Sequence, residues 1–506
     1  METNTKYTLE NRRYVIIGAV VLLVLVFIIR LFYLQVVEND YKAWADSNAF
    51  LKKTLLPSRG MIYDRNDNLL VYNQPAYDVM LIMREIQPFD TLDFCNILSI
   101  TKEQFEKRIA EIKNRRLNPG YSSYVPQVFM NHLSAQECGI LQEKLYKFPG
   151  FYIQNRTIRQ YEYPYAAHVL GNIGQVNRKD IEADDYYVQG DDSGRAGVER
   201  SYEKQLRGEK GVEILLRDVH GRIKGKYDDG ASDVAPVSGK NLKLSLDINL
   251  QAYGEKLMKN KVGSIVMIEP ETGEVLCLVT SPNYDPSLLV GRQRGKNHRM
   301  LEENPQTPLI DRSITGFYPP GSTFKPTQGL IFLQEGVITP STMYTCAHGY
   351  TYSIKRKPAC HGHASPLSLV PALATSCNSF FCWGLHDMLD NRRRYPTVQE
   401  GFEVWKNHLV SMGYGYPLGI DLPGEKRGYI PNSKVYDKLH RRWNSSTIIS
   451  IAIGQGEISA TPLQICNLAA TIANRGYFIT PHVVKEVQDT PLDSLYTQKR
   501  YPTIDS

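Results

Sequence analysis

A single apolar run near the N-terminus constrains this chain more than any other feature of its sequence. Between Tyr14 and Leu34 the residues are almost wholly apolar, and only Gly18 and Arg30 interrupt them. A helix of this length would be about 31 Å long, which matches the hydrocarbon thickness of a bilayer. A cleaved signal peptide would have a shorter apolar core and a small-residue cleavage site, which the end of the run does not offer. We therefore predict a transmembrane helix at residues 14–35.

The flanking charges predict the orientation of this helix. Arg12 and Arg13 precede the apolar run, so the positive-inside rule places a short tail, residues 1–13, in the cytoplasm. Everything after about residue 36 then lies outside the cytoplasm. The alternative interpretation is a buried core helix. It would need a later segment that could cover so apolar a surface, and the sequence offers none.

Residues 36–240 predict a non-catalytic α+β module, called the pedestal below. Polar helical patterns at residues 92–114 and 134–146 alternate with short strands such as 77–83. Glycine-punctuated motifs follow, among them 168–174, and each glycine allows a tight turn or a close backbone approach. No nucleophile and base come together in this part of the sequence.

The pattern changes near residue 240. The expected elements are a strand, a helix and two hairpin strands, at residues 242–246, 248–260, 264–269 and 274–279. A helix-rich block follows and runs to about residue 476. Strands followed by a block of helices indicate a sheet packed against helices, so residues 241–506 are predicted to form a second α+β domain.

The totals exclude one class of partner. The formal net charge of +6 is mild, and the sequence has no Gly-rich phosphate loop, zinc-finger spacing or basic stripe, so nucleic acid is not expected. Four of the eight cysteines lie between positions 346 and 382. This clustering differs from a disulfide framework spread over a small secreted domain, so a local metal or redox cluster has to be considered.

The stretch Tyr318–Pro326 places a serine three residues before a lysine, at the start of an apolar run. If a helix begins near Ser322, Lys325 lies one turn on, on the same face. A serine hydroxyl is a poor nucleophile until a neighbour takes its proton, and an amine that is held neutral can do so. The pattern alone is weak, because Ser201–Lys204 also matches it among charged residues.

A second motif, Ser376-Cys377-Asn378, also leads into an apolar run. Its hydroxyl could relay a proton, and its amide could hold a substrate amide. Ser-x-x-Lys followed by Ser-x-Asn is the order found in penicillin-recognising serine acyl transferases. The chain resembles the class B penicillin-binding proteins and, within them, the elongation-specific subfamily, penicillin-binding protein 2. The resemblance also rests on short motifs at residues 284–286, 308–312, 413–415, 453–456 and 460–464.

This resemblance implies a peptidoglycan D,D-transpeptidase of the bacterial inner membrane, single-pass, with its catalytic domain in the periplasm. Ser322 would attack the D-Ala-D-Ala carbonyl of a stem peptide, with Lys325 as its base, and β-lactams would acylate the same serine. By analogy, Ser376 would relay a proton and Asn378 would bind substrate. The partner that the resemblance implies is a RodA-type SEDS glycosyltransferase. No organic cofactor is expected.

One family feature is missing from the sequence. The third motif, Lys-Thr/Ser-Gly, should follow residues 453–456 by several dozen residues, but neither form occurs before the chain stops at Ser506. In the family, the strand that carries this motif supplies an oxyanion-hole N–H, and loss of one such donor costs about 10²–10³ in rate. We therefore expect a truncated chain of an enzyme family, with a true pseudoenzyme as the alternative.

Cysteines and histidines between the two motifs form a second constellation. Three thiols and an imidazole within 32 residues could make a tetrahedral zinc site. Some family members carry zinc between the first two motifs, and matching by position favours Cys346, Cys360, His363 and Cys377, with His361 as the substitute. Such a site would hold the loop of the Ser-x-Asn motif in place. The alternative is a Cys346–Cys360 disulfide in an oxidising compartment.

Other functions stay open from the sequence. A catalytically silent scaffold that activates a SEDS polymerase would fit the missing third motif. A β-lactam-sensing receptor or a membrane-tethered β-lactamase would carry the same first two motifs. The large pedestal argues against both, as does the lack of a recognisable deacylating Glu motif. Within the family, the division-specific homologue, penicillin-binding protein 3, is the nearer alternative.

Overall fold

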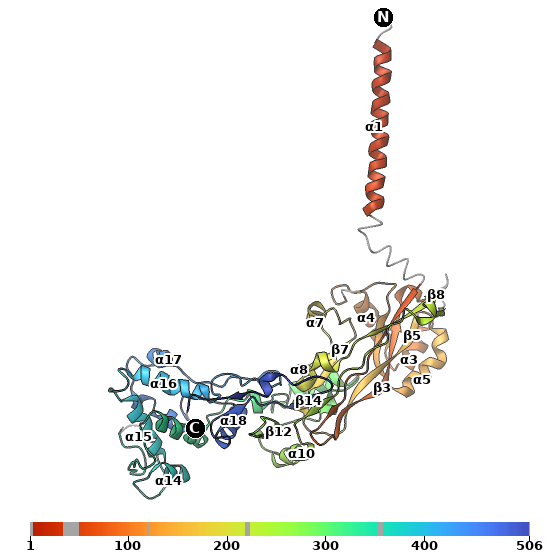
Figure 1. The fold of residues 1–506 in the computed structure, drawn as a ribbon. Coiled ribbons are helices and arrows are strands. Elements are labelled where there is room, and N and C mark those ends of the chain that lie inside the picture. The colour runs from red at the N-terminus through yellow and green to blue at the C-terminus, as the bar shows by residue number, and fades with distance from the viewer. Residues whose placement is uncertain (1–3, 34–49, 119–120, 218–222, 353–357, 505–506) are drawn as a thin grey trace.

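The computed structural model describes residues 4–33, 50–118, 121–217, 223–352 and 358–504. The chain is a mixture of helices and strands, and the predicted α+β class is confirmed. In Figure 1 one long helix stands apart, and the rest of the chain forms a sheet-rich region and a helix-rich region placed end to end.

The apolar run forms helix α1 (Asn4–Phe32). Its part Arg13–Phe32 is long and apolar enough to cross a membrane, and none of it is buried against the described chain. The side chains that would be costly to expose to water therefore lie on the outside of the molecule. This exposure fits a membrane anchor and contradicts the alternative of a buried core helix.

The pedestal is built around a six-stranded sheet in which β3 (Leu69–Leu81) is the central member. It pairs antiparallel with β5 (Phe151–Tyr161) along one edge and with β4 (Gln127–Leu133) on the other. Alternate residues of β4 are buried, as expected for a strand with one face on a core. A cluster of phenylalanines from these strands and the neighbouring helices fills that core.

Helices cover the end of this sheet. The pattern at 92–114 forms two helices, α3 (Thr91–Ile97) and α4 (Lys102–Lys113), because Thr101 caps a new start with a reciprocal capping box. Helix α5 (Ala135–Lys144) begins with a similar box at Ser134. The other pedestal elements are β1 (Phe50–Leu55), β6 (Asn172–Gln175), β7 (Asp192–Ala196), β8 (Gly211–Arg217), β9 (Ile223–Lys226), α6 (Ala167–Leu170), α7 (Arg178–Ala183), α8 (Gly197–Ser201) and α9 (Glu203–Leu206).

The pedestal sheet also contains strands from the C-terminal region. Strand β10 (Leu242–Leu244) runs parallel to β2 (Ile62–Tyr63) and antiparallel to β14 (Val484–Val487). Strands from both sides of residue 240 therefore share one hydrogen-bonded sheet. The two regions are joined by backbone pairing as well as by the covalent chain.

The C-terminal region contains the predicted hairpin. Strands β11 (Gly263–Ile268) and β12 (Val275–Ser281) pair antiparallel. Helices α10 (Ile248–Leu257) and α18 (Pro462–Ala473) contact these strands. The helical block contains α11 (Arg294–Glu302), α12 (Arg312–Thr315), α13 (Lys325–Gln334), α14 (Leu369–Ala374), α15 (Asn378–Leu389), α16 (Val398–Ser411) and α17 (Ser433–Leu439). Its core is aromatic, with Phe324, Phe332, Phe381 and Trp405 fully buried.

Candidate active site and the neighbouring thiol cluster

Ser322 and Lys325 lie where a short 3-10 turn passes into a helix. Ser322 is the second residue of η6 (Gly321–Phe324), and Lys325 is the first residue of α13. Gly321 has a φ of +60°, which a glycine adopts without steric cost. Ser322 is exposed, whereas Lys325 is only 1% exposed. The turn therefore presents the hydroxyl to the outside and buries the amine one turn later.

Lys325 reaches the second motif through three short contacts. Its Nζ lies 2.6 Å from Asn378 Oδ1, 2.7 Å from the Ser376 carbonyl oxygen and 2.9 Å from Ser376 Oγ. Ser376 Oγ lies 3.0 Å from Ser322 Oγ. The structure thus brings together all four residues that the two motifs nominate. Ser376 stands between the other serine and the lysine, so the hydrogen-bonded path from Ser322 to Lys325 passes through it.

The surroundings of Lys325 are apolar or neutral. Its hydrogen-bond partners are oxygens of uncharged groups, and in the described part of the chain it has no carboxylate partner. Burial lowers the pKa of Lys325, and the thiols of Cys360, Cys377 and Cys382 oppose this only in part. A lowered pKa increases the share of neutral amine, which is the form that can accept a proton.

The loop of the second motif is held in a strained conformation. Ser376 has a φ of +53°, and a left-handed backbone costs a non-glycine residue about 1–2 kcal/mol. Cys377 follows as the cap of α15, with its Sγ accepting from the Phe380 N–H. Asn378 Nδ2 donates to the Ala359 carbonyl oxygen at 2.6 Å. Contacts of the two residues that follow Ser376 therefore maintain its conformation and its distance to Lys325.

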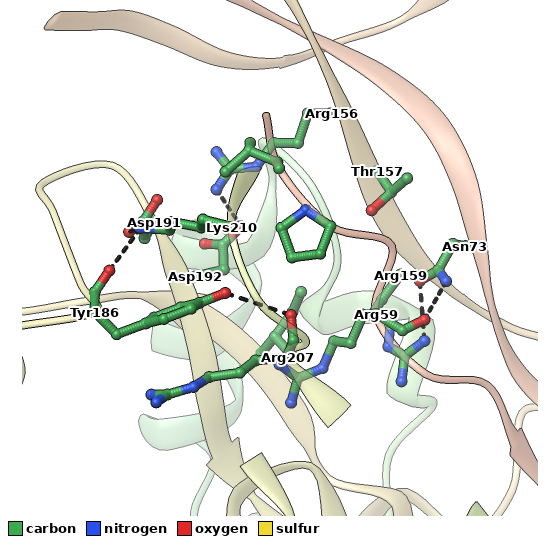
Figure 2. A pocket seen from close by; sticks show the side chains of 13 residues that line it. Arg59, Asn73, Arg156, Thr157, Arg159, Tyr186, Asp191, Asp192, Arg207 and Lys210 are labelled. Carbon is green, nitrogen blue, oxygen red and sulfur yellow. Dashed lines mark hydrogen bonds and ion pairs between the residues drawn. The ribbon is translucent and has the colours of Figure 1, made fainter. Parts of the chain in front are cut away.

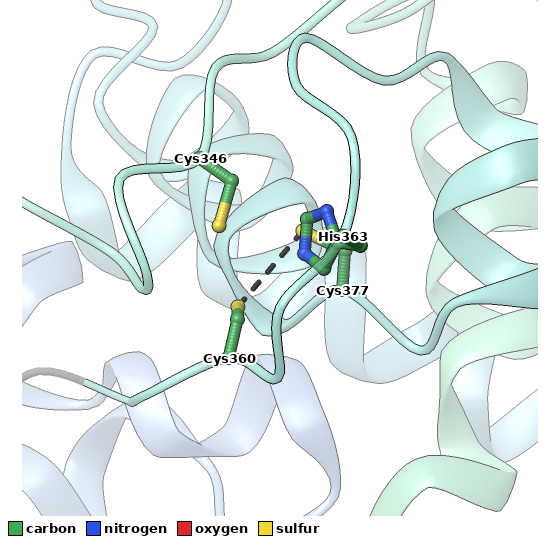
Figure 3. A group of neighbouring side chains, drawn as sticks. All are labelled: Cys346, Cys360, His363 and Cys377. Atoms are coloured by element: carbon green, nitrogen blue, oxygen red, sulfur yellow. Dashed lines mark hydrogen bonds between the residues drawn. The ribbon is translucent and has the colours of Figure 1, made fainter.

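Four side chains converge beside this loop, as Figure 3 shows. The sulfur atoms of Cys346, Cys360 and Cys377 and a ring nitrogen of His363 all lie within 4.8 Å of one another. His361, the substitute in the prediction, does not belong to this group. The Ser379 N–H donates to Cys360 Sγ at 3.3 Å, so the cluster also contacts the helix that carries the second motif.

The thiols of the cluster are free. No cysteine of the described chain is in a disulfide. Sγ of Cys360 and Sγ of Cys377 are 4.0 Å apart, about twice the length of an S–S bond. The alternative of a Cys346–Cys360 disulfide is therefore not formed in this structure. Burial raises the pKa of Cys360, but the hydrogen bond from the Ser379 N–H and the neighbouring His363 and Cys346 side chains outweigh it and hold the pKa below its usual value.

A cavity of about 80 Å³ lies in the pedestal, away from these residues, and is lined by several basic side chains (Figure 2). Two of its arginines are paired with buried carboxylates. Arg159 Nε lies 2.8 Å from Glu199 Oε1, and Arg156 Nη1 lies 2.9 Å from Asp78 Oδ2. Because these charges are already compensated, the cavity belongs to a structural charge network and brings no nucleophile and base together.

Comparisons with known proteins place this architecture. Residues 54–244 match the family model of the penicillin-binding protein dimerisation domain, and residues 263–504 match the penicillin-binding protein transpeptidase domain. Among relatives, the peptidoglycan D,D-transpeptidase MrdA of Acinetobacter baumannii is 32% identical over 489 residues, which cover 94% of this chain and 69% of that protein. MrdA of Escherichia coli K12 is 29% identical over 520 residues, covering 98% of this chain and 78% of that protein.

Solved structures agree with these sequence matches. The complex of penicillin-binding protein 2 with MreC from Helicobacter pylori superposes with a TM-score of 0.71 at 26% identity, covering 88% of this chain and 82% of that one. The two domain matches define a penicillin-binding protein with a transpeptidase domain. The chain belongs to the penicillin-binding protein 2 (MrdA) family of peptidoglycan D,D-transpeptidases. The family predicted from the sequence motifs is confirmed.

Proposed function

We propose that this chain cross-links peptidoglycan stem peptides through an acyl-enzyme on Ser322. The observation that carries the proposal is the hydrogen-bonded series from Ser322 Oγ through Ser376 Oγ to Lys325 Nζ, with steps of 3.0 and 2.9 Å. A nucleophile, a relay and a buried amine with a lowered pKa are the groups that acyl transfer from a serine requires.

In the first half of the reaction, Ser322 Oγ bonds to the carbonyl carbon of the penultimate D-alanine. Its proton passes by way of Ser376 to the neutral Lys325 amine. The peptide C–N bond then breaks, and the proton returns through Ser376 to the nitrogen of the departing D-alanine. In the second half, an amine of a neighbouring strand bonds to the ester carbon. The bond between that carbon and Ser322 Oγ breaks, the proton that the amine gives up goes to Ser322 Oγ, and the new amide is the cross-link.

The other residues of the site orient these groups. Asn378 Oδ1 accepts from Lys325, and the half-buried Asn378 is the residue that we propose to hold a substrate amide. The Ser376 carbonyl oxygen accepts a second hydrogen from the amine. When the neutral amine donates its two hydrogens to these two oxygens, the lone pair of Lys325 Nζ faces Ser376 Oγ. The proton arrives from that direction.

We propose further that the thiol cluster holds a zinc ion. Four ligand atoms suit a tetrahedral site, and a Zn–S bond of about 2.3 Å implies S–S separations of about 3.8 Å, close to the 4.0 Å between Cys360 and Cys377. His363 Nδ1 lies 2.7 Å from the Ala364 carbonyl oxygen, and its buried Nε2 lacks a partner. Donation by Nδ1 leaves Nε2 with the lone pair that a metal needs. A bound ion would supply structural rigidity to the loop of Ser376.

The proposed placement in the cell follows from α1 and its flanks. Residues 1–13 lie in the cytoplasm, residues 14–35 span the inner membrane, and the pedestal (36–240) and the transpeptidase domain (241–506) lie in the periplasm. The substrate polymer is outside the cytoplasm, which supports this orientation. A RodA-type SEDS glycosyltransferase, which would supply new glycan strands, is the proposed partner through α1 and the pedestal.

Labelling with a fluorescent penicillin tests the acyl-enzyme. The full chain in detergent should form a covalent adduct that withstands denaturation, and Ser322→Ala should abolish it, because no other oxygen takes its place. Ser201→Ala, in the second Ser-x-x-Lys match, is the control and should label like the unmodified chain. A folded protein that gives no adduct would instead support the silent scaffold. An adduct on the Ser322→Ala variant would contradict the proposed site.

Metal analysis tests the zinc proposal independently of labelling. Protein purified without chelators should contain about one zinc per chain, and Cys360→Ser should lower that content and the melting temperature together. Cys95→Ser, at a buried thiol of the pedestal core, is the control that should leave the metal content unchanged. Metal-free protein with a Cys346–Cys360 disulfide would refute the zinc site.

A further inference from the structure

Two motifs of the sequence, at residues 453–456 and 460–464, have no part in the reaction described above. Both contact the loop that presents Ser322. Tyr318 and Ala460 exchange two backbone hydrogen bonds, of 3.0 Å from the Tyr318 N–H and 2.9 Å from the Ala460 N–H. At the other end of the loop, the Gly321 N–H donates to the Gly454 carbonyl oxygen at 2.8 Å. The loop of residues 318–321 is therefore held at its two ends by one short segment, residues 454–460.

Gly454 must be a glycine for two separate reasons. Its φ of +70° lies in the left-handed region that side chains disfavour. A Cβ at this position would stand 2.3 Å from the Gly321 carbonyl oxygen and 2.7 Å from the Gly321 nitrogen. Both atoms belong to backbone, so relief of the clash requires the backbone next to Ser322 to move.

The same segment is tied to the helix that carries Lys325. Gln328 of α13 donates from Nε2 to the Ile451 carbonyl oxygen at 3.2 Å, and its Oε1 accepts from Trp405 Nε1 at 2.8 Å. Gln328 is fully buried, so these bonds do not exchange readily with water. The segment thus contacts both the turn of the nucleophile and the helix of the base.

We propose that residues 451–460, called the brace below, set the distance between the Ser322 hydroxyl and the group that takes its proton. Gly454 and Gln328 are positioning residues of this brace: Gly454 acts on the nucleophile turn, and Gln328 fixes the brace to α13. Neither touches the substrate. This inference rests on the proposed acyl transfer, because it explains how the exposed Ser322 keeps a defined position next to Ser376.

The expected effect is on the chemical step. Reacting groups must be held in a near-attack arrangement, and a displacement of about 1 Å can cost about 100-fold in rate. A Cβ at residue 454 that pushes on the Gly321 backbone should therefore slow acylation. It should leave the initial binding of a β-lactam almost unchanged. A residue that only stabilised the fold would change the melting temperature and not the rate constant of the folded protein.

The experiment compares two glycines that both have a positive φ, +70° at Gly454 and +92° at Gly424. Gly454→Ala pays for the left-handed φ and for the clash with Gly321. Gly424→Ala has a φ of +92° and nothing within 4 Å of its new Cβ, so it carries the backbone cost without the clash. Benzylpenicillin acylation is followed by stopped flow, and the saturating rate constant is separated from the dissociation constant of the initial complex. Thermal melting and circular dichroism establish that both variants are folded.

We expect Gly454→Ala to lower the saturating acylation rate constant about 10- to 100-fold, with the dissociation constant within about 3-fold, whereas Gly424→Ala stays within about 2-fold on both. Gln328→Met should lower the same rate constant by a smaller factor. Equal rates for the two alanine variants would overturn the brace, as would a loss confined to the dissociation constant. If the unmodified chain itself forms no acyl-enzyme, the proposed function fails first, and that result is distinguishable from failure of the brace alone.

Discussion

The pedestal and the active site both bury positive side chains, and they do so in opposite ways. In the pedestal, Glu199 is fully buried and accepts from Arg59 Nε at 2.6 Å and from Arg159 Nε at 2.8 Å. Burial lowers the pKa of Arg59, but the carboxylates of Glu199 and Glu203 outweigh it and hold the pKa above its usual value. Arg159 shares Glu199 and is more deeply buried, and there burial outweighs the carboxylate and lowers the pKa from the high value of a guanidinium. At the active site, Lys325 is also buried, but its partners are neutral oxygens and its pKa is lowered.

This difference separates a structural cation from a reactive one. A guanidinium matched by carboxylates keeps its proton and fixes the geometry between the pedestal elements. An amine without a carboxylate is costly to keep charged, so its pKa falls and it loses its proton at a lower pH than an exposed lysine does. Removing one carboxylate from the pedestal should therefore lower the free energy of unfolding. Adding one at the active site should instead slow acylation.

The largest effect is expected when the pedestal loses its central carboxylate. Glu199→Gln keeps the shape of the side chain but leaves Arg59 and Arg159 short of compensation in a buried place. Breaking a buried ion pair by removal of one partner costs about 3–5 kcal/mol, so denaturant unfolding should show a loss of that size. The protein that remains folded should still acylate at the unmodified rate. An unchanged free energy of unfolding would contradict the structural role of the network.

The next effect comes from adding a carboxylate at the active site. Asn378→Asp places a charged oxygen where Oδ1 now lies 2.6 Å from Lys325 Nζ. An opposite charge at this distance raises a lysine pKa by about 1–3 units, so acylation at neutral pH should slow by about 10- to 1,000-fold. The free energy of unfolding should not fall, because the buried amine gains a partner.

Asn378→Ala is the control for that experiment, since it removes the amide without adding charge. The aspartate variant should regain rate as the pH is raised, because alkaline solution restores the neutral amine. The alanine variant should stay slow across the same range. Identical pH–rate profiles for the two variants would show that charge compensation at Lys325 is not the cause.

The unmodified protein should report the lowered pKa of Lys325 directly. Acylation should increase with pH and level off once the pH passes the folded-state pKa, which lies below the ordinary value of 10.5. The stability of the folded state should also increase with pH. Between the folded-state pKa and 10.5 the unfolded chain binds the proton and the folded chain does not, so this group makes the folded state more stable as the pH rises through that window. Lys325→Met should remove this part of the pH dependence, and its persistence would assign it to another group.

The sequence was sufficient for the features that depend on neighbours along the chain. The spacing of Ser322 and Lys325 predicts that both lie within one turn, and the membrane helix follows from a continuous apolar run. Contacts between distant segments could not be predicted from the sequence. The left-handed φ of Ser376, which brings its Oγ between Ser322 and Lys325, depends on packing around α15 and has no signature in a Ser-x-Asn triplet.

The boundary near residue 240 shows the same limit. Alternating residues predict the strand β10, but its partners in the sheet are β2 and β14, which lie far away in the sequence on either side. Register between such strands is set by the buried face of the assembled sheet, and a three-residue strand carries too little pattern to specify it. The contact of Gly454 with Gly321 was missed for a related reason, because it joins backbone to backbone and depends on no side chain that a motif could display.

The smallest effect is expected where a charge pair of the pedestal lies in water. Arg178 Nε and Glu182 Oε1 are 2.7 Å apart on α7, a distance like that of the Arg159–Glu199 pair, but the two side chains are 61% and 55% exposed. Solvent screens an exposed i,i+4 pair, so Glu182→Gln should cost about 0.3–0.5 kcal/mol in denaturant unfolding, with less at high salt. The same chemical substitution at Glu199 and at Glu182 thus differs in burial and in the number of arginine partners, two for Glu199 and one for Glu182. If the two variants lost equal stability, burial would not be what distinguishes the charge network of the pedestal, and the contrast with Lys325 would lose its physical basis.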